Sequence, residues 1–221
     1  MQQVVFATFN RGKVREVGNL LAGLELEVLS PADFGISTLP LETGDTFLEN
    51  AVIKASAVWQ QLRIPVMADD SGLLVHALDG APGVSSARYA GPDANDKANN
   101  LKLLEALSGE TNRSAAFFCQ AVCILNNTWP VASLEGLDPN LQVRTGYLGK
   151  DCHLLVASGS VSGVIAQAPA GEGGFGYDPI FYLESHKQTF AQIDQAEKNR
   201  LSHRGQAFRT LKKAFEAMMQ V

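Results

Sequence analysis

The sequence predicts an α/β protein, in which strands and helices alternate along a chain of 221 residues. A short run at 2–9, rich in valine and phenylalanine, leads through a polar turn to apolar residues at helical spacing. A second helix and strand are predicted at 46–70, where an amphipathic helical pattern precedes an apolar strand. A near-continuous apolar run at 115–125 predicts a central strand. These observations favour a sheet with helices packed against it.

Composition limits the classes of function. Hydrophobic residues make up 46% of the chain and charged residues 19%, which is ordinary for a globular protein. The net charge of −5 argues against a nucleic-acid partner, which would need a basic surface. No apolar run reaches membrane-spanning length, and the N-terminus does not resemble a signal peptide, so we expect a cytoplasmic protein without a membrane partner. The three cysteines, which lack metal-ligand spacing, are expected to be buried thiols: Cys119, Cys123 and Cys152.

The helix that precedes the apolar strand has a clear signal at each end. Thr46 and Glu49 have the spacing of a capping box, and Pro65 ends the helix. The strand that follows is predicted to end at Asp69 and Asp70. Neighbouring side chains on a strand point to opposite faces, so both carboxylates can contribute only through a turn, a metal or a hydrogen-bond network.

The remaining elements follow the same rules. The segment 126–152 lacks regular periodicity and is predicted to be an extended hairpin or an insertion within a single domain, 1–221. The other predicted strands are Leu24–Leu29, His153–Ala157, Val161–Ala166 and Ile180–Leu183, and the other helices are Asp96–Leu107, with Leu101, Leu104 and Leu107 on its apolar side, and Ala196–Met219.

Four polar clusters lie at the ends of these elements: Thr8–Lys13, Glu42 with Asp69–Ser71, Gly174–Asp178, and Lys198 with His203 and Arg204. Carboxylates are the ligands that Mg²⁺ prefers, and lysine and arginine suit phosphate oxygens. Aromatic rings on a glycine-rich loop offer a stacking surface for a base. Together the clusters describe a nucleotide phosphate site, in which a carboxylate could orient or deprotonate water for attack on phosphorus.

Each cluster also has a purely structural interpretation. The strand–turn–helix at 2–21 lacks the P-loop spacing and is typical of a capped helix. An Asp-Ser-Gly string is common in turns. Phe175 and Tyr177 could belong to the core, and 198–204 could be a solvated helix face. The residue types alone leave these interpretations and a metal-dependent phosphate-ester enzyme equally open.

Six short strings, taken in order, resemble the inosine triphosphate pyrophosphatase family, and its bacterial dITP/XTP branch most closely. Each string is weak alone, but the ordered set covers nearly the whole chain. The strings are Thr8-x-Asn10-x-x-Lys13, Glu42-Thr43-Gly44-x-Thr46-Phe47-x-Glu49-Asn50-Ala51, Ala68-Asp69-Asp70-Ser71-Gly72-Leu73, Gly80-Ala81-Pro82-Gly83 with Ser86-Ala87-Arg88-Tyr89, Gly173-Gly174-Phe175-Gly176-Tyr177-Asp178-Pro179-Ile180-Phe181, and Glu197-Lys198 with Ser202-His203-Arg204-Gly205.

The resemblance implies hydrolysis of non-canonical purine nucleoside triphosphates (ITP, dITP and XTP) to the monophosphate and pyrophosphate, which cleanses the nucleotide pool. It also implies a Mg²⁺ requirement, a homodimer, and an elongated mixed sheet flanked by helices, with two lobes and a central cleft. It implies that Asp70 is the catalytic carboxylate and that Glu42, Asp69 and Asp70 hold the metal. The substrate-binding residues it implies are Thr8, Asn10, Lys13, Ser71, Phe175, Gly176, Tyr177, Asp178, Lys198, His203 and Arg204.

The chain departs from the family pattern at a few positions. Phe9 stands where a small residue is usual, and Leu41 where many members have a second acidic residue. These departures keep a second hypothesis open, a nucleotide-binding regulatory protein without turnover. A third hypothesis is a pyrophosphatase for modified pyrimidine nucleotides, which shares the strand–turn–helix opening.

Overall fold

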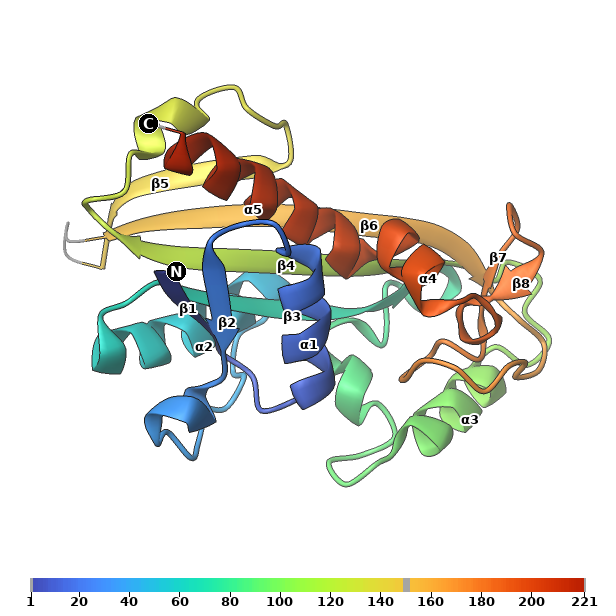
Figure 1. Cartoon of the computed structure of the whole chain (residues 1–221). Coiled ribbons are helices and arrows are strands. Elements are labelled where there is room, and N and C mark those ends of the chain that lie inside the picture. The colour runs from blue at the N-terminus through green and yellow to red at the C-terminus, as the bar shows by residue number, and fades with distance from the viewer. Residues whose placement is uncertain (1, 149–151, 221) are drawn as a thin grey trace. The chain divides into compact units, whose positions relative to one another are not determined.

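The structure is a computed structural model that describes residues 2–148 and 152–220, and its strands form one mixed sheet of eight (Figure 1). The strand order is β2-β1-β3-β4-β6-β7-β8, with β5 also paired to β6. β1 runs parallel to β2 and β3, whereas the β5–β6, β6–β7 and β7–β8 pairs are antiparallel. The predicted α/β class with a mixed sheet is therefore confirmed. The strands are β1 Gln2–Phe6, β2 Leu26–Leu29, β3 Val66–Val75, β4 Ser114–Asn126, β5 Leu141–Tyr147, β6 Cys152–Ile165, β7 Phe181–Leu183 and β8 Gln188–Thr189.

Helices accompany the sheet. They are α1 Arg11–Leu20, α2 Phe47–Leu62, α3 Asp96–Ala106, α4 Gln195–Leu201 and α5 His203–Met219. The predicted capping box of α2 is present, because Thr46 accepts a hydrogen bond from the Glu49 backbone and Glu49 accepts one from the Thr46 backbone. Within residues 2–148 and 152–220, none of the helices combines the length and the apolar character needed to cross a bilayer.

The chain divides into two compact units. Unit 1 comprises Met1–Asp70, Cys119–Gly159 and Arg204–Val221, and unit 2 comprises Ser71–Phe118 and Ser160–His203. Strands β3, β4 and β6 each contribute residues to both units. One unit boundary falls between Asp70 and Ser71 and another between His203 and Arg204, so both lie within strings that the sequence singled out.

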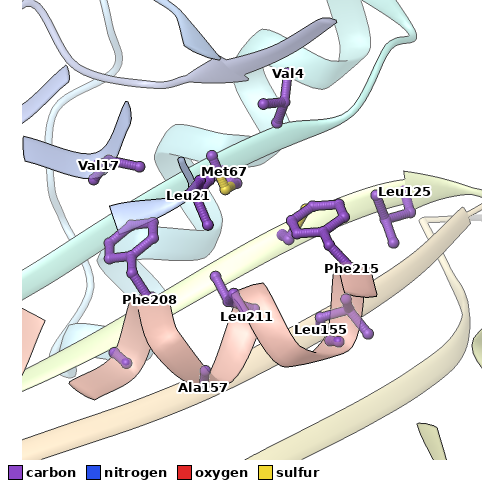
Figure 2. Packing of buried hydrophobic residues seen from close by; sticks show 14 of the residues in the cluster. Val4, Val17, Leu21, Met67, Leu125, Leu155, Ala157, Phe208, Leu211 and Phe215 are labelled. Atoms are coloured by element: carbon purple, nitrogen blue, oxygen red, sulfur yellow. The ribbon is translucent and has the colours of Figure 1, made fainter. Parts of the chain in front are cut away.

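Unit 1 has a helix layer on each face of its sheet, and the alternation of the strands explains why. Val4 and Phe6 pack with α1 and α5, while Val5 and Ala7 pack with α2. Figure 2 shows Phe208, Leu211 and Phe215 of α5 pointing toward the strands. All three cysteines are buried free thiols, as predicted. The predicted inner face of the last helix is also confirmed, since it is buried at Ala207, Leu211, Ala214, Phe215 and Met218.

Unit 2 has its own apolar core, which β3, β4, β6 and β7 build with α3. Its buried members include Leu73, Phe117 and Phe181. The predicted inner face of this helix is confirmed at Leu104 and Leu107 but wrong at Leu101, which is 50% exposed while Leu103 is buried. Asn99 and Asn100 are buried on this helix as well. The buried face of α3 therefore carries amides in addition to leucines.

Three predicted boundaries were wrong. β3 does not end at Asp70 but continues to Val75, because buried Leu73 and Val75 extend the strand into the core of unit 2. The predicted strands on either side of Gly159 are one strand, β6. The predicted helix 196–219 is two helices, because Ser202 adopts extended backbone angles (φ −62°, ψ 151°).

The packing of α5 leads to a stability prediction. Phe208 is fully buried, and its ring meets Phe6 edge-on with centroids 5.4 Å apart. Phe208→Ala should lower the free energy of unfolding by about 3–5 kcal/mol, because it leaves a cavity in a close-packed core. Urea denaturation measures the change. Leu41→Ala is the control, since Leu41 is 83% exposed and its truncation should cost less than about 0.5 kcal/mol. Equal changes in the two variants would contradict the packing described.

Candidate active site

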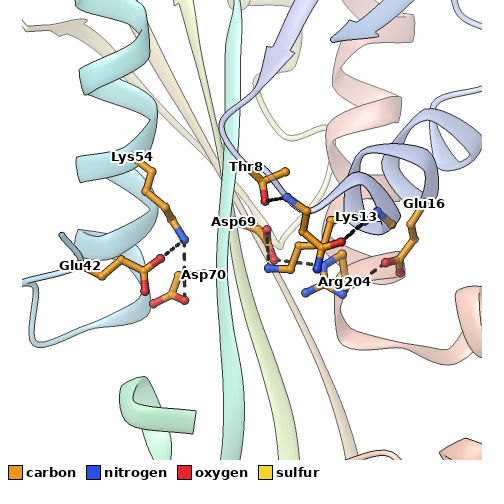
Figure 3. A network of polar contacts seen from close by, with 10 residues as sticks. Thr8, Lys13, Glu16, Glu42, Lys54, Asp69, Asp70 and Arg204 are labelled. Atoms are coloured by element: carbon orange, nitrogen blue, oxygen red, sulfur yellow. Dashed lines mark hydrogen bonds and ion pairs between the residues drawn. The ribbon is translucent and has the colours of Figure 1, made fainter. Parts of the chain in front are cut away.

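The two aspartates in the middle of β3 point to opposite faces of the sheet (Figure 3). Asp69 follows the side-chain direction of Met67, which packs with α1 and α5. Asp70 follows Ala68, which packs with α2. Each carboxylate therefore faces a different helix layer of unit 1 and contacts different partners there.

Asp69 lies between two cations. The Lys13 ammonium of α1 lies 3.4 Å from Asp69 Oδ1, and the Arg204 guanidinium of α5 donates to Asp69 Oδ2 at 3.1 Å. Arg204 also pairs with Glu16 of α1 at 3.3 Å. Asp69 and Arg204 are almost completely buried, so the ion pairs join β3 to α1 and α5 inside unit 1.

These contacts set the protonation states on this face. Burial raises the pKa of Asp69, but Lys13 and Arg204 outweigh it, so the pKa lies well below the ordinary value for aspartate. Burial lowers the pKa of Lys13, and Asp69 opposes that effect only in part. For Arg204, Asp69 and Glu16 more than offset the effect of burial, and its pKa is raised. Asp69 is thus a permanently charged partner for the two cations.

The loop before α1 is ordered by its own side chains. Asn10 caps the helix, because its side-chain oxygen accepts hydrogen bonds from the backbone N–H groups of Gly12 and Lys13 at 2.9 and 3.1 Å. Thr8 in turn accepts a bond from the Asn10 backbone at 3.2 Å. Thr8, Asn10 and Lys13 therefore form one turn at the N-terminus of α1, where the helix dipole favours an anion.

Asp70 meets α2 on the other face. Asn50 donates to Asp70 Oδ2 at 3.0 Å. The Lys54 ammonium lies 4.0 Å from Asp70 Oδ1 and 2.5 Å from Glu42 Oε1, so it links the two carboxylates. Asn50 also accepts a bond from the Gly44 backbone at 2.8 Å, which fixes the Glu-Thr-Gly string close to this face.

The charge on this face differs from the charge around Asp69. Burial raises the pKa of Asp70, Lys54 lowers it, and the nearby Glu42 raises it further. Two carboxylates share one ammonium here, whereas around Asp69 two carboxylates meet two cations. Lys54 thus contacts both carboxylates of this face, Glu42 and Asp70.

The predicted metal ligands do not all come together. Among residues 2–148 and 152–220, no three Asp, Glu, His or Cys side chains are grouped closely enough to hold a metal by themselves. Glu42 and Asp70 share a face, whereas Asp69 lies with Lys13 and Arg204. A pair of carboxylates still suits Mg²⁺, which commonly takes one or two of them and completes its shell with water and phosphate oxygens.

In unit 2, the glycine-rich loop 173–178 is tied to α4. Asp178 accepts hydrogen bonds from the Phe175 backbone at 2.7 Å and from the Lys198 ammonium at 2.5 Å. The same ammonium lies 4.6 Å from the centroid of the Phe175 ring, which is 51% exposed. Gly174 must be glycine, because a Cβ there would lie 2.0 Å from Asp178 Oδ2. The loop presents one aromatic ring to solvent next to a buried cation.

Two other predicted substrate-binding residues of unit 2, Tyr177 and His203, are buried against the core of the unit. Tyr177 is buried in the core, and its hydroxyl donates to the Ser86 carbonyl at 2.8 Å. His203 is also buried, with its ring stacked on Phe117 at 4.8 Å. Ser71, the residue after Asp70, is half-buried. Of the two aromatic residues proposed for stacking, only Phe175 exposes its ring.

Three residues of this arrangement were not among the predicted site residues: Glu16, Asn50 and Lys54. Asn50 and Lys54 are one helical turn apart, next to the predicted apolar positions Ala51 and Ala55 of α2. A buried amide and a buried ammonium at helical spacing inside an apolar face are a signal that could have found them. Glu16 lies one helical turn after Lys13 on α1, and no local pattern links it to its distant partner Arg204.

Residues 4–214 match the sequence model of the Ham1 family. The chain belongs to the Ham1 family. Two relatives named dITP/XTP pyrophosphatase have 43% identity to this Ham1 chain. The Shigella flexneri protein aligns over 213 residues, 96% of each chain, and the Geobacillus kaustophilus protein over 221 residues, 99% of this chain and 97% of its own. The family resemblance predicted from the ordered strings is confirmed.

Solved structures give the same assignment. A HAM1 protein from Coxiella burnetii superposes with a TM-score of 0.82 at 40% identity, covering 98% of this chain and 99% of its own. A nucleoside-triphosphatase and dITP/XTP pyrophosphatase from Mycobacterium abscessus superposes with a TM-score of 0.70 at 33% identity, covering 95% and 98%. One family therefore spans both units of the Ham1 chain.

The ion pairs of Asp69 lead to a second prediction. Asp69→Asn should lower the free energy of unfolding by about 3 kcal/mol, because it removes a carboxylate partner of the buried Arg204. Chemical denaturation at neutral pH measures the change. Glu27→Gln is a matched carboxylate-to-amide control at an exposed position and should change the value by less than about 0.5 kcal/mol. A loss for Asp69→Asn no larger than the control's would contradict the assigned role.

Proposed function

We propose that this chain is a dITP/XTP pyrophosphatase, which hydrolyses ITP, dITP and XTP to the monophosphate and pyrophosphate. The observation that carries the proposal is the alignment of relatives with that name over 96–99% of the chain. The side chains around β3 support it, since cations on one face and paired carboxylates on the other are what cleavage of a phosphoric anhydride needs.

Residues of unit 1 would hold the triphosphate and carry out the hydrolysis. Lys13 and Arg204 supply positive charge for phosphate oxygens, and the capped N-terminus of α1 adds the positive end of the helix dipole. Asp69 acts as a positioning residue in this proposal, since it holds both cations in place. This differs from its role as a metal ligand in the family resemblance.

Asp70 would orient a water molecule and accept its proton. The water oxygen bonds to the α phosphorus, the bond between that phosphorus and the oxygen bridging to the β phosphate breaks, and pyrophosphate leaves with the bonding electrons. Asn50 fixes the orientation of the Asp70 carboxylate, and Lys54 favours its ionised form. Glu42 and Asp70 would hold Mg²⁺, which when bound supplies positive charge for the phosphate oxygens.

Residues of unit 2 would recognise the base. The exposed ring of Phe175 offers a stacking surface, and the Lys198 ammonium beside it is a hydrogen-bond donor. A 6-oxo purine presents an acceptor where adenine presents an amine, so this donor favours the former. The remaining parts of the proposal come from the family resemblance: a Mg²⁺ requirement, a homodimer, and a cytoplasmic location.

Product analysis tests the proposal. The protein is incubated with dITP, ITP, XTP, ATP, GTP, dUTP and methylated UTP in the presence of Mg²⁺, and pyrophosphate and orthophosphate are assayed separately. We expect pyrophosphate, with kcat/KM for dITP and XTP at least about 100-fold above that for ATP, because adenine presents an amine where a 6-oxo purine presents an acceptor to the Lys198 ammonium. A chelated sample without Mg²⁺ is the control and should release no pyrophosphate.

Other outcomes of the same assay would replace the proposal. Equal turnover of ATP, or release of orthophosphate alone, would contradict it. Tight ITP binding without turnover at any Mg²⁺ concentration would favour a regulatory nucleotide-binding protein. A preference for dUTP or methylated UTP would favour a pyrophosphatase for modified pyrimidine nucleotides.

A further inference from the structure

Helix α3 contacts the glycine-rich loop through two residues one turn apart. Asp96, the first residue of α3, accepts a hydrogen bond from the Gly176 backbone N–H at 2.7 Å. Asn100 donates its side-chain N–H to the Gly176 carbonyl at 3.1 Å. Residues four apart lie on the same face of a helix, so one face of α3 binds both the backbone N–H and the carbonyl of Gly176.

The residue held in this way has an unusual conformation. Gly176 has φ +63°, in the left-handed region that favours glycine, although a Cβ there would meet nothing within 4 Å. Without external contacts, a glycine is the most mobile point of a loop. The two bonds from α3 therefore fix the backbone next to Phe175, whose own N–H is already held by Asp178.

Asn100 is suited to this task by its burial and by its chemistry. It is 7% exposed, and within the described part of the chain its Oδ1 has no hydrogen-bond partner. If the amide were flipped, its oxygen would face the Gly176 carbonyl, and two acceptors would then repel each other. The bond to Gly176 therefore sets the observed orientation of the Asn100 amide. A buried amide with one bond to a loop carbonyl does little for α3 itself, which indicates a role in the loop.

The same helix also supports the string before it. Asn99 bonds the backbone of Ala87 and Ala90, and the Lys102 ammonium bonds the Tyr89 carbonyl at 2.6 Å. Tyr177, next to Gly176, reaches the Ser86 carbonyl. α3 is thus a rigid element against which two loops are set, and Asp96 with Asn100 serve the one that carries Phe175.

We propose that Asp96 and Asn100 form a clamp on Gly176 that positions the Phe175 ring for stacking on the purine base. Both are positioning residues, since neither needs to touch the base. The purine in this inference rests on the proposed function, whereas the clamp itself is a property of unit 2. Loss of the clamp should weaken base binding and leave the hydrolytic step intact.

Amide hydrogen exchange tests the clamp without any nucleotide. In Asp96→Ala, NMR should show the Gly176 amide exchanging about tenfold faster, because its only α3 acceptor is gone. Asp96→Asn keeps a side-chain oxygen and should restore exchange to within about twofold. Asn100→Asp should also speed exchange, because a carboxylate repels the Gly176 carbonyl. Leu101→Asn, an exposed change on the same helix, is the control and should alter nothing.

Steady-state kinetics with dITP test the positioning role. Asp96→Ala and Asn100→Asp should raise KM about three- to tenfold with kcat within about twofold, and Asp96→Asn should rescue KM. Unchanged Gly176 exchange in both variants, or equal acceleration in Leu101→Asn, would overturn the clamp. Faster exchange with an unchanged KM would overturn the positioning role. If the wild-type protein hydrolyses no purine triphosphate, the proposed function fails, and the exchange data still decide the clamp.

Discussion

The pleat of β3 at Asp69 and Asp70 is the constraint on which the rest of the site depends. Two adjacent residues of one strand must point to opposite faces, and in unit 1 each face is covered by helices. Asp69 is delivered to α1 and α5, and Asp70 to α2 (Figure 3). A string that looks like one acidic pair in the sequence is therefore two separate carboxylates with different partners.

The two buried carboxylates also differ in their pKa values, which are shifted in opposite directions. A buried carboxylate is tolerated only when its charge is compensated, and Asp69 has two cations that lower its pKa. Asp70 and Glu42 both contact the Lys54 ammonium, and the pKa of Asp70 is raised, chiefly by burial. In the proposed function, the first arrangement would hold cations for the phosphates, and the second would keep a carboxylate available to accept a proton. In unit 2, Lys198 likewise has two contacts, since it pairs with Asp178 and lies over the Phe175 ring.

Much of this could be predicted from local patterns. The capping box of α2, the inner face of α5 and the buried cysteines follow from spacing and composition, and the ordered strings identified the family. The end of β3 could not be predicted, because Ser71 and Gly72 are turn formers that tertiary packing of Leu73 and Val75 overrides. Lys54, Glu16 and the α3 clamp depend on partners 12 to 188 positions away, and no local pattern encodes such distances.

The proposed roles of Asp70 as proton acceptor and Asp69 as positioning residue are tested most directly by comparing dITP hydrolysis in two variants. These are Asp70→Asn and Asp69→Asn, measured under conditions in which both are folded. Asp70→Asn should lower kcat by about a thousandfold or more with KM within a few-fold, because it removes the proton acceptor. Asp69→Asn should act mainly on KM, because it loosens the cations that would hold the triphosphate. An Asp69→Asn variant with a kcat as low as that of Asp70→Asn, or an Asp70→Asn variant that keeps most of its kcat, would contradict the assignment.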